Sequence, residues 1–130
     1  MSNRAIDYGL DPNICYITGY LHDIGYIESK QNHGLIGAGL LNNLNVSPEL
    51  TFAIQNHGKR LYDLEEVTPL LVLLVEADLR VNYKGKVVSF EERMKSISAR
   101  YSTNTIDLCK DNIKYIQEFL ERSNINGCDK

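Results

Sequence analysis

The sequence predicts an all-α protein, a single compact and irregular helical bundle. Three observations predict this class: helix start signals, long segments with helical periodicity, and a scarcity of strand signals. Each proline follows a residue that caps helices, in the pairs Asp11-Pro12, Ser47-Pro48 and Thr68-Pro69. Because proline is favoured at the first helical position after such a cap, each pair predicts a helix start. Only the short piece Val87-Val88 resembles a strand.

The helices follow from these starts and from apolar periodicity. A fourth start lies at Ser89, where Glu92 three residues later completes a capping box. The predicted helices cover residues 12–23, 33–44, 48–57, 69–81, 90–101 and 105–122. Residues 1–8 predict the last turns of a helix that begins earlier, with Gly9 as its C-cap residue. Segment 69–81 is apolar almost all round and predicts a buried central helix, whereas segment 105–122 is amphipathic and is expected to pack across the outside.

Length and composition limit the classes of protein. The chain has 130 residues, which predicts one domain over residues 1–130. Apolar residues make up 43% and charged residues 24%, an ordinary globular composition. The net charge of −3 argues against a protein that coats nucleic acid, since neutralising phosphates requires an excess of Lys and Arg.

The cysteines and the apolar runs predict a cellular compartment. Cys15, Cys109 and Cys128 form no CxxC pair, so we expect neither a disulfide framework nor a cysteine zinc site. The N-terminus lacks the apolar segment of a signal peptide. The longest apolar run, residues 69–75, is far shorter than the roughly 18–20 residues of a membrane span. We therefore expect a soluble cytoplasmic protein with no membrane partner, and the sequence does not indicate its oligomeric state.

The histidines stand on the inward faces of their predicted helices. His57 follows Leu50, Ala53 and Ile54 at helical spacings, and His22 and His33 stand on similar inner stripes. A single His on an apolar face is usually a hydrogen-bonded core residue. All three histidines of the chain share this placement, however, and that coincidence favours a common site.

Asp78 is the unexpected residue of the central helix. Its helical neighbours are Leu71, Leu74 and Val75, where an unpaired carboxylate would cost several kcal/mol. Glu76 in the same helix has Arg80 four residues on as a partner. Asp78 therefore predicts either a metal ligand or, equally well, a carboxylate that caps or pairs with another helix.

Together these residues predict a metal site. His nitrogen and Asp oxygen without thiolate suit Mn, Fe, Ni, Co or Zn, and Mg less well. Two such ions that share a bridging carboxylate form a site for in-line attack on a phosphate ester. Asp23, directly after His22 near the end of its helix, is the second candidate carboxylate.

The order and spacing of these elements resemble the HD superfamily of metal-dependent phosphohydrolases. The elements are Gly19-Tyr20-Leu21-His22-Asp23-Ile24-Gly25, then His33 with Gly37-Ala38, then His57, then Glu76-Ala77-Asp78. The resemblance covers about residues 5–101 and leaves the helix 105–122 outside. It implies a helical HD-type fold, one or two divalent metal ions, a metal-activated water, and a small phosphorylated substrate, a nucleotide being one candidate.

The resemblance also implies a role for each residue. The metal ligands would be His22, Asp23, His33, His57 and Asp78. The first metal would take His22, Asp23 and Asp78. The two remaining histidines would hold a second ion with Asp23 bridging, or contact the substrate phosphate. The nearest basic candidates for the phosphate oxygens are Lys59, Arg60 and Arg80, for which solvated surface charge, or the pair with Glu76, is an equally good explanation.

Two departures from the family pattern leave a second hypothesis open. The family's metal set begins with a histidine on an upstream helix, which would fall before Met1 and is absent here. Tyr26 stands where many members carry Lys. The alternative is a degenerate HD domain that binds a nucleotide or a protein partner without turnover. A purely structural helical module is the third hypothesis, and it does not explain the inward-facing histidines.

Overall fold

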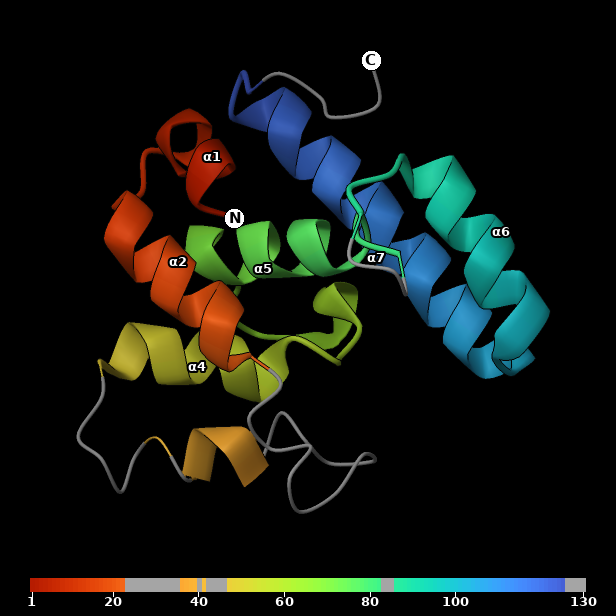
Figure 1. The fold of residues 1–130 in the computed structure, drawn as a ribbon, viewed down its shortest axis with the longest axis horizontal. Helices are drawn as coiled ribbons and strands as arrows, with labels where there is room; N and C mark the ends of the chain where they lie inside the picture. Colours follow the sequence, from red (N-terminus) through yellow and green to blue (C-terminus); the bar gives the residue numbers. More distant parts are fainter. Residues whose placement is uncertain (23–35, 40, 42–46, 83–85, 126–130) are drawn as a thin grey trace. The chain divides into compact units, whose positions relative to one another are not determined.

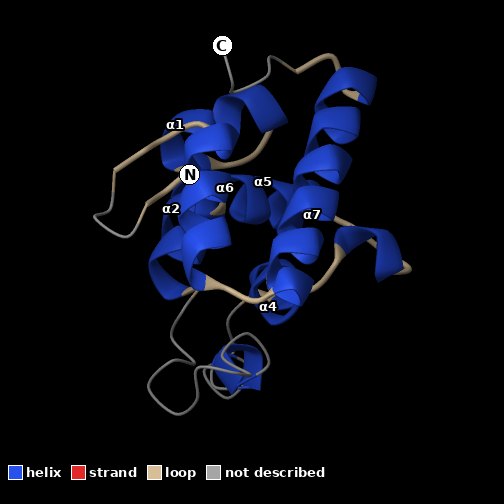
Figure 2. Ribbon diagram, turned by 90° about the vertical axis from the view of Figure 1, so that its right-hand side faces the viewer, coloured by secondary structure: helices blue, strands red, loops and turns tan. Residues whose placement is uncertain are grey.

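The computed structural model describes residues 1–22, 36–39, 41, 47–82 and 86–125. Within these residues the regular elements are all helical, which confirms the predicted all-α class (Figure 1 and Figure 2). The helices are α1 (Ser2–Ala5), α2 (Pro12–Leu21), α4 (Pro48–Asn56), α5 (Pro69–Asp78), α6 (Phe90–Arg100) and α7 (Thr103–Arg122), with the short 3-10 helices η1 (Ile6–Tyr8) and η3 (Leu61–Asp63). Residues 36–39 and 41 are also helical.

The helix starts predicted at the three prolines and after Ser89 are confirmed. Each proline is the first residue of its helix. The Asp11 carboxylate accepts a hydrogen bond from the backbone N–H of Asn13 at 2.8 Å, and the Ser89 hydroxyl accepts one from Glu92 at 3.1 Å. These side chains satisfy N–H groups that the first turn of a helix leaves without a partner. Gly9 ends the first helical segment at φ 69°, the left-handed conformation expected of a C-cap glycine.

Several helix ends differ from the predicted bounds. The helices predicted over residues 12–23 and 48–57 end at Leu21 and Asn56. The predicted segment 69–81 is helical only as far as Asp78. Beyond it, Val81 and Val87 form an isolated β-bridge, so the short extended piece predicted near residue 87 exists. Helix α7 begins two residues before its predicted start because the Ser102 hydroxyl caps it. Of the predicted helix 33–44, residues 33–35, 40 and 42–44 lie outside the described residues.

The chain divides into two compact units. The first unit consists of Met1–Gly58 and Val67–Leu74. In it, α1 packs against α2 and α2 packs against α4 (Figure 1). Its buried apolar side chains include Ala5, Cys15, Ala38, Leu41, Leu50, Ala53, Ile54, Leu70 and Leu71.

The second unit consists of Lys59–Glu66 and Val75–Lys130. In it, α7 packs against both α6 and η3. The side chain of Asn112, only 2% exposed, joins α7 to the backbone around η3. Its carbonyl oxygen accepts a hydrogen bond from the N–H of Leu61 at 2.8 Å, and its amide N–H donates to the carbonyl of Lys59 at 3.0 Å. This η3 turn was not predicted from the sequence.

The two helices that the sequence distinguished by their apolar pattern behave as expected. Residues 70–76 of α5 are all buried, as its nearly continuous apolar surface predicts. Helix α7 buries one face, with Cys109, Asn112, Ile116 and Leu120 at spacings of three and four residues, and exposes charged residues on the other. In the described part of the chain, no helix combines the length and apolar character that crossing a bilayer requires.

Candidate metal centre

Two of the three histidines meet at the ends of two packed helices. His22 is the C-cap residue of α2, and His57 is the C-cap residue of α4. Their rings lie edge to face, with centroids 5.5 Å apart and planes at 81°. His57 is only 5% exposed and His22 is half-buried, so the prediction that they face inward is confirmed for both. The sequence separates them by 35 positions, and the packing of α2 on α4 brings them together.

Both rings are oriented in the same way by their own helices. Nδ1 of His22 lies 2.6 Å from the carbonyl oxygen of Gly19, and Nδ1 of His57 lies 2.5 Å from that of Ile54. Because a carbonyl oxygen can only accept, each Nδ1 carries the hydrogen and donates it. The neutral imidazole then has its lone pair on Nε2. A backbone carbonyl that holds Nδ1–H in this way is the usual support for a histidine that binds metal through Nε2.

The electrostatics of this corner favour a cation. The last carbonyl groups of a helix have no intrahelical partners and carry the negative end of the helix dipole. The C-terminal ends of α2 and α4 meet at the histidine pair, so two negative dipole ends face the same region. Both imidazoles are neutral when they bind an ion, so the pair adds no positive charge that would repel a cation.

Two other predicted ligands, Asp23 and His33, lie outside the described residues. Within the residues that the structure describes, no three His, Cys, Asp or Glu side chains come close enough to hold a metal ion. The pair His22–His57 is therefore the part of the predicted ligand set whose geometry is known.

Asp78 differs from its prediction in burial. It belongs to the second unit, where it is the last residue of α5, and its side chain is exposed rather than buried. The expected burial assumed a helix as far as residue 81, which would have placed Val81 on the same face. The helix ends at Asp78, so the inner stripe does not extend to this position. The buried carboxylate of α5 is instead Glu76, which is 2% exposed.

In the second unit, Asp78 is one of the charged groups that shift the pKa of Cys109. Burial raises the pKa of this thiol, the Arg93 guanidinium opposes the rise, and the Asp78 carboxylate adds to it. Asp78 and Arg93 therefore act on the same buried sulfur, one from α5 and the other from α6. Cys109 and Cys15 are both free thiols, as predicted, and burial also raises the pKa of Cys15.

The basic candidates for phosphate binding are not alike. The Arg60 side chain pairs with Asp111 at 3.3 Å, and the Arg80 side chain donates a hydrogen bond to the carbonyl of Val88 at 3.1 Å. Both arginines therefore have contacts within the second unit. Lys59 is exposed. Arg80 lies two residues beyond the end of α5 at Asp78.

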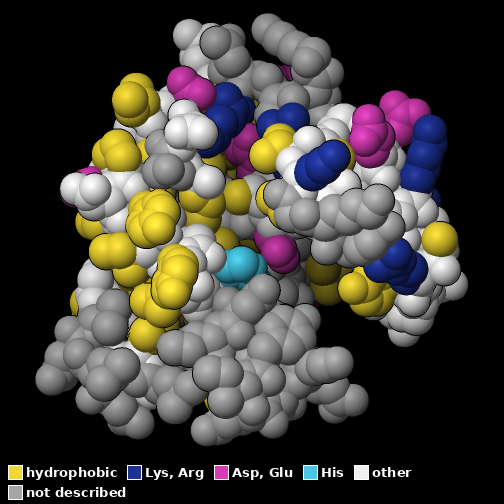
Figure 3. Space-filling model, viewed as in Figure 1, with side chains coloured by type: hydrophobic (Ala, Val, Ile, Leu, Met, Phe, Trp, Pro, Cys, Tyr) yellow, Lys and Arg dark blue, Asp and Glu magenta, His cyan; other side chains and the backbone are white. Residues whose placement is uncertain are grey.

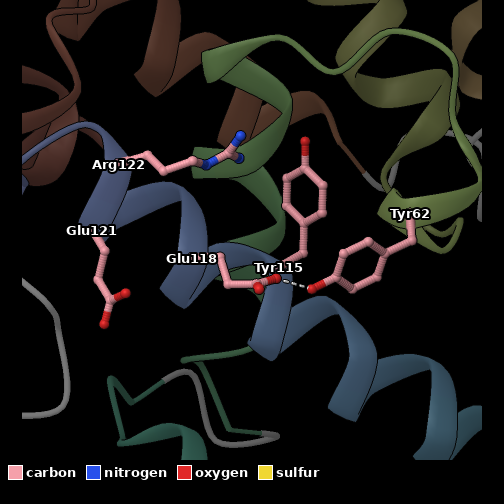
Figure 4. Close-up of a pocket in the computed structure, with 5 residues that line it drawn as sticks. All are labelled: Tyr62, Tyr115, Glu118, Glu121 and Arg122. Carbon is pink, nitrogen blue, oxygen red and sulfur yellow. Dashed lines mark hydrogen bonds between the residues drawn. The ribbon is translucent and has the colours of Figure 1, made fainter.

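A hollow of about 400 Å³ lies on the second unit, and none of the described residues that line it is a predicted site residue (Figure 4). Its lining consists of Tyr62, Tyr115, Glu118, Glu121 and Arg122. The hydroxyl of Tyr62 donates a hydrogen bond to the Glu118 carboxylate, which raises the pKa of Tyr62 to about 12. The rings of Tyr62 and Tyr115 meet edge to face at 5.1 Å. These contacts connect η3 to α7, and they explain the hollow as a by-product of that packing.

Comparison with known proteins identifies one family. A family model described as the HD domain matches residues 3–82, more than half of the chain. This range contains both members of the histidine pair and the other predicted ligands. No curated protein and no solved structure matches the chain.

Proposed function

Because the chain belongs to the HD-domain family, we propose that it is a metal-dependent phosphohydrolase acting on a small phosphorylated compound. The family consists of phosphohydrolases that generally use divalent metal ions. One observation of this chain carries the proposal: the rings of His22 and His57 lie side by side, each with Nδ1 bound to a backbone carbonyl. In both rings this bond leaves Nε2 with the lone pair, and Nε2 is the atom through which a histidine held in this way binds a metal.

The residues fit a divalent ion by their chemistry. Two imidazoles with the lone pair on Nε2 are ligands for Mn, Fe, Co, Ni or Zn, and neighbouring carboxylates extend the set toward Mg. Asp23 follows His22 directly in the sequence, and His33 lies in the same matched range. We assign Asp23, His33 and Asp78 as the remaining ligands, with Asp23 as the bridge if two ions are bound. This assignment rests on the motif.

The histidine pair and Asp23 would have different roles in hydrolysis. A bound divalent ion would supply the Lewis acidity that polarises the phosphoryl oxygens and lowers the pKa of water toward neutrality. The histidine pair would hold that ion in place, since its rings are fixed by the ends of α2 and α4. Asp23 would accept the proton of the attacking water.

Substrate binding requires a cationic group for the phosphate. Of the three basic candidates, Lys59 is the exposed one, whereas Arg60 and Arg80 already make bonds in the second unit. We therefore rank Lys59 first as the residue that holds a phosphate oxygen. A nucleotide is one candidate substrate. The free buried thiols of Cys15 and Cys109 support a reducing compartment, the cytoplasm, as the place of this activity.

The first test is the metal content of the chain purified without chelator and without a histidine tag. We expect bound Mn, Fe, Co, Ni or Zn by elemental analysis, and hydrolysis of a chromogenic phosphomonoester or of nucleotides once the best metal is supplied. Asp78→Ala should lower both metal content and activity. The matched control is Asp107→Ala, which removes an exposed aspartate of α7 and should change neither.

Two results would contradict the proposal. A native chain that takes up no metal after reloading would remove its basis. Unchanged metal content and activity in Asp78→Ala would show that the motif assigns this ligand wrongly.

A further inference from the structure

Helix α2 has an outer face without charge. We define this outer α2 face by Asn13, Tyr16, Ile17 and Tyr20, which recur at helical spacings of three, four and seven residues. Tyr16 is 63% exposed, Ile17 45% and Tyr20 79%. The whole helix, PNICYITGYL, contains no Asp, Glu, Lys or Arg. Such a stripe of apolar and aromatic positions is the pattern with which a helix packs against another helix.

The inner face of α2 is already occupied. Cys15 and Thr18 are fully buried, and they lie on the side that packs in the first unit. A surface helix normally exposes charged residues opposite its buried side, as α7 does with Lys110, Lys114 and Glu118. In α2 both sides are apolar. Figure 3 shows hydrophobic side chains gathered on the surface in the region of α1 and α2.

The outer α2 face is also preformed. The rings of Tyr16 and Tyr20 stack with centroids 6.5 Å apart and planes at 17°. Tyrosines that are already ordered lose little conformational freedom when a partner covers them, which lowers the cost of association. Enrichment in Tyr and depletion of charge are the compositional marks of the core of a protein–protein interface.

We propose that the outer α2 face binds the same face of a second copy of this chain, forming a two-fold dimer through α2. A two-fold interface uses the same patch on both copies, and the ridges of one α2 helix can pack into the grooves of the other. The chain as a whole carries a net charge of −3, so two copies repel each other at their charged surfaces. The outer α2 face carries no charged side chain, so this repulsion is weak there.

The exposed area is of the size that such a dimer needs. Standard interfaces bury about 800 Å² per partner, of which about 65% is apolar in homodimers, or roughly 500 Å². Tyr16, Ile17 and Tyr20 present roughly 400 Å² if a large side chain offers about 150–250 Å², which matches the apolar share of a small interface of about 600 Å² per partner. A lipid surface is a poorer occupant, because helices that lie on membranes carry Lys or Arg on their polar face and α2 has none.

The experiment is sedimentation equilibrium of the full chain over a wide range of concentration, with light scattering after size exclusion. We expect a reversible monomer–dimer equilibrium. Tyr16→Lys with Tyr20→Lys should weaken dimerisation at least about tenfold, since central aromatic residues dominate interface energies. Ile17→Lys is a second, milder variant. The matched control is Tyr101→Lys, an exposed tyrosine of the second unit, which should dimerise like the native chain.

Three outcomes would overturn the proposal. One is a native chain that remains monomeric at every concentration. Another is a dimer that the two α2 variants, shown by circular dichroism to be folded, leave unchanged. The third is a chain that stays monomeric but co-sediments with anionic or neutral phospholipid vesicles, which would assign the outer α2 face to lipid instead.

Discussion

His57 and Asn112 are two buried polar side chains that use their atoms in different ways. Asn112, in the second unit, uses both ends of its amide on the backbone of another segment, at Leu61 and Lys59. His57, in the first unit, uses Nδ1 on its own helix, at Ile54, and its ring meets that of His22. Both are at most 5% exposed, so burial does not distinguish them.

The different hydrogen bonds indicate a structural role for the Asn112 amide and a metal-binding role for the His57 imidazole. A buried amide that bridges two segments stabilises their packing, and its removal leaves two backbone groups unsatisfied. The Nδ1 hydrogen bond of His57 stays within its own helix and joins no two segments, and this tautomer suits the Nε2 atom for a metal. Substitution should therefore affect metal binding at one position and stability at the other.

The largest expected effect is the loss of metal from His57→Ala. Removal of a ligand should lower metal affinity by more than the roughly 10–100-fold that loss of a supporting hydrogen bond costs. The measurement is isothermal titration with Co²⁺ or Zn²⁺, with the cobalt absorption spectrum as an independent readout. The control is Asn56→Ala, a buried neighbour whose amide bonds only to Phe52 of the same helix. Equal metal loss in both variants would mean that damage to α4 causes it.

The second-largest expected effect is a loss of stability when the Asn112 amide is removed. Asn112→Ala should lower the free energy of unfolding by about 1–3 kcal/mol, because the Leu61 N–H is left buried without its partner and the Lys59 carbonyl loses its bond to the amide. It should leave metal affinity unchanged. Urea denaturation measures the loss, and Asn104→Ala, on an exposed position of α7, is the control. A loss no larger than that of the control would show that the amide does not hold η3 to α7.

A smaller loss of stability is expected when the exposed cap of α6 at Ser89 is removed. Ser89→Ala removes the side-chain cap of α6 and should cost about 1 kcal/mol of unfolding free energy. Ser98→Ala, on an exposed interior position of the same helix, should cost nothing, since Ala has the higher helix propensity. Equal stability of the two variants would argue against the cap.

The smallest effect concerns the exposed bond between Tyr62 and Glu118, and it is visible only at high pH. The carboxylate raises the pKa of Tyr62 to about 12, above the value near 10 of an unfolded chain. The protonated tyrosine is therefore favoured in the folded state, and its contribution is complete below pH 10. That contribution should be lost as the pH rises from about 10 to about 12.

Tyr62→Phe should remove this part of the pH dependence. Thermal unfolding of native and variant chains across the alkaline range would measure the difference. Glu118→Ala removes both the hydrogen-bond acceptor and the charge that raise the pKa of Tyr62, and it should flatten the profile in the same way. Parallel profiles for the native chain and both variants would show that the bond does not persist in solution.

For helix α5, the local sequence pattern predicts the buried helix correctly but not which of its carboxylates is buried. The apolar run of residues 70–76 predicts a buried helix, because a helix that is apolar all round can only be stable inside. The same pattern predicts a buried Asp78 and gives Glu76 a partner in Arg80, whereas in the structure Asp78 is exposed and Glu76 is buried. Which carboxylate is buried depends on where the helix ends, and helix ends are decided by caps and by packing beyond the helix itself.

By itself, the sequence determined the all-helical class, the helix starts, the buried α5 and the inward placement of His22 and His57. These follow from local rules: cap residues satisfy the first N–H groups, and apolar spacing selects the buried face. Tertiary structure alone decided that the rings of His22 and His57 touch, that Asn112 holds η3 to α7, and that the outer face of α2 is exposed. Each of these is a contact or an exposure that depends on residues far apart in the chain, and spacing along one helix carries no information about what packs against it.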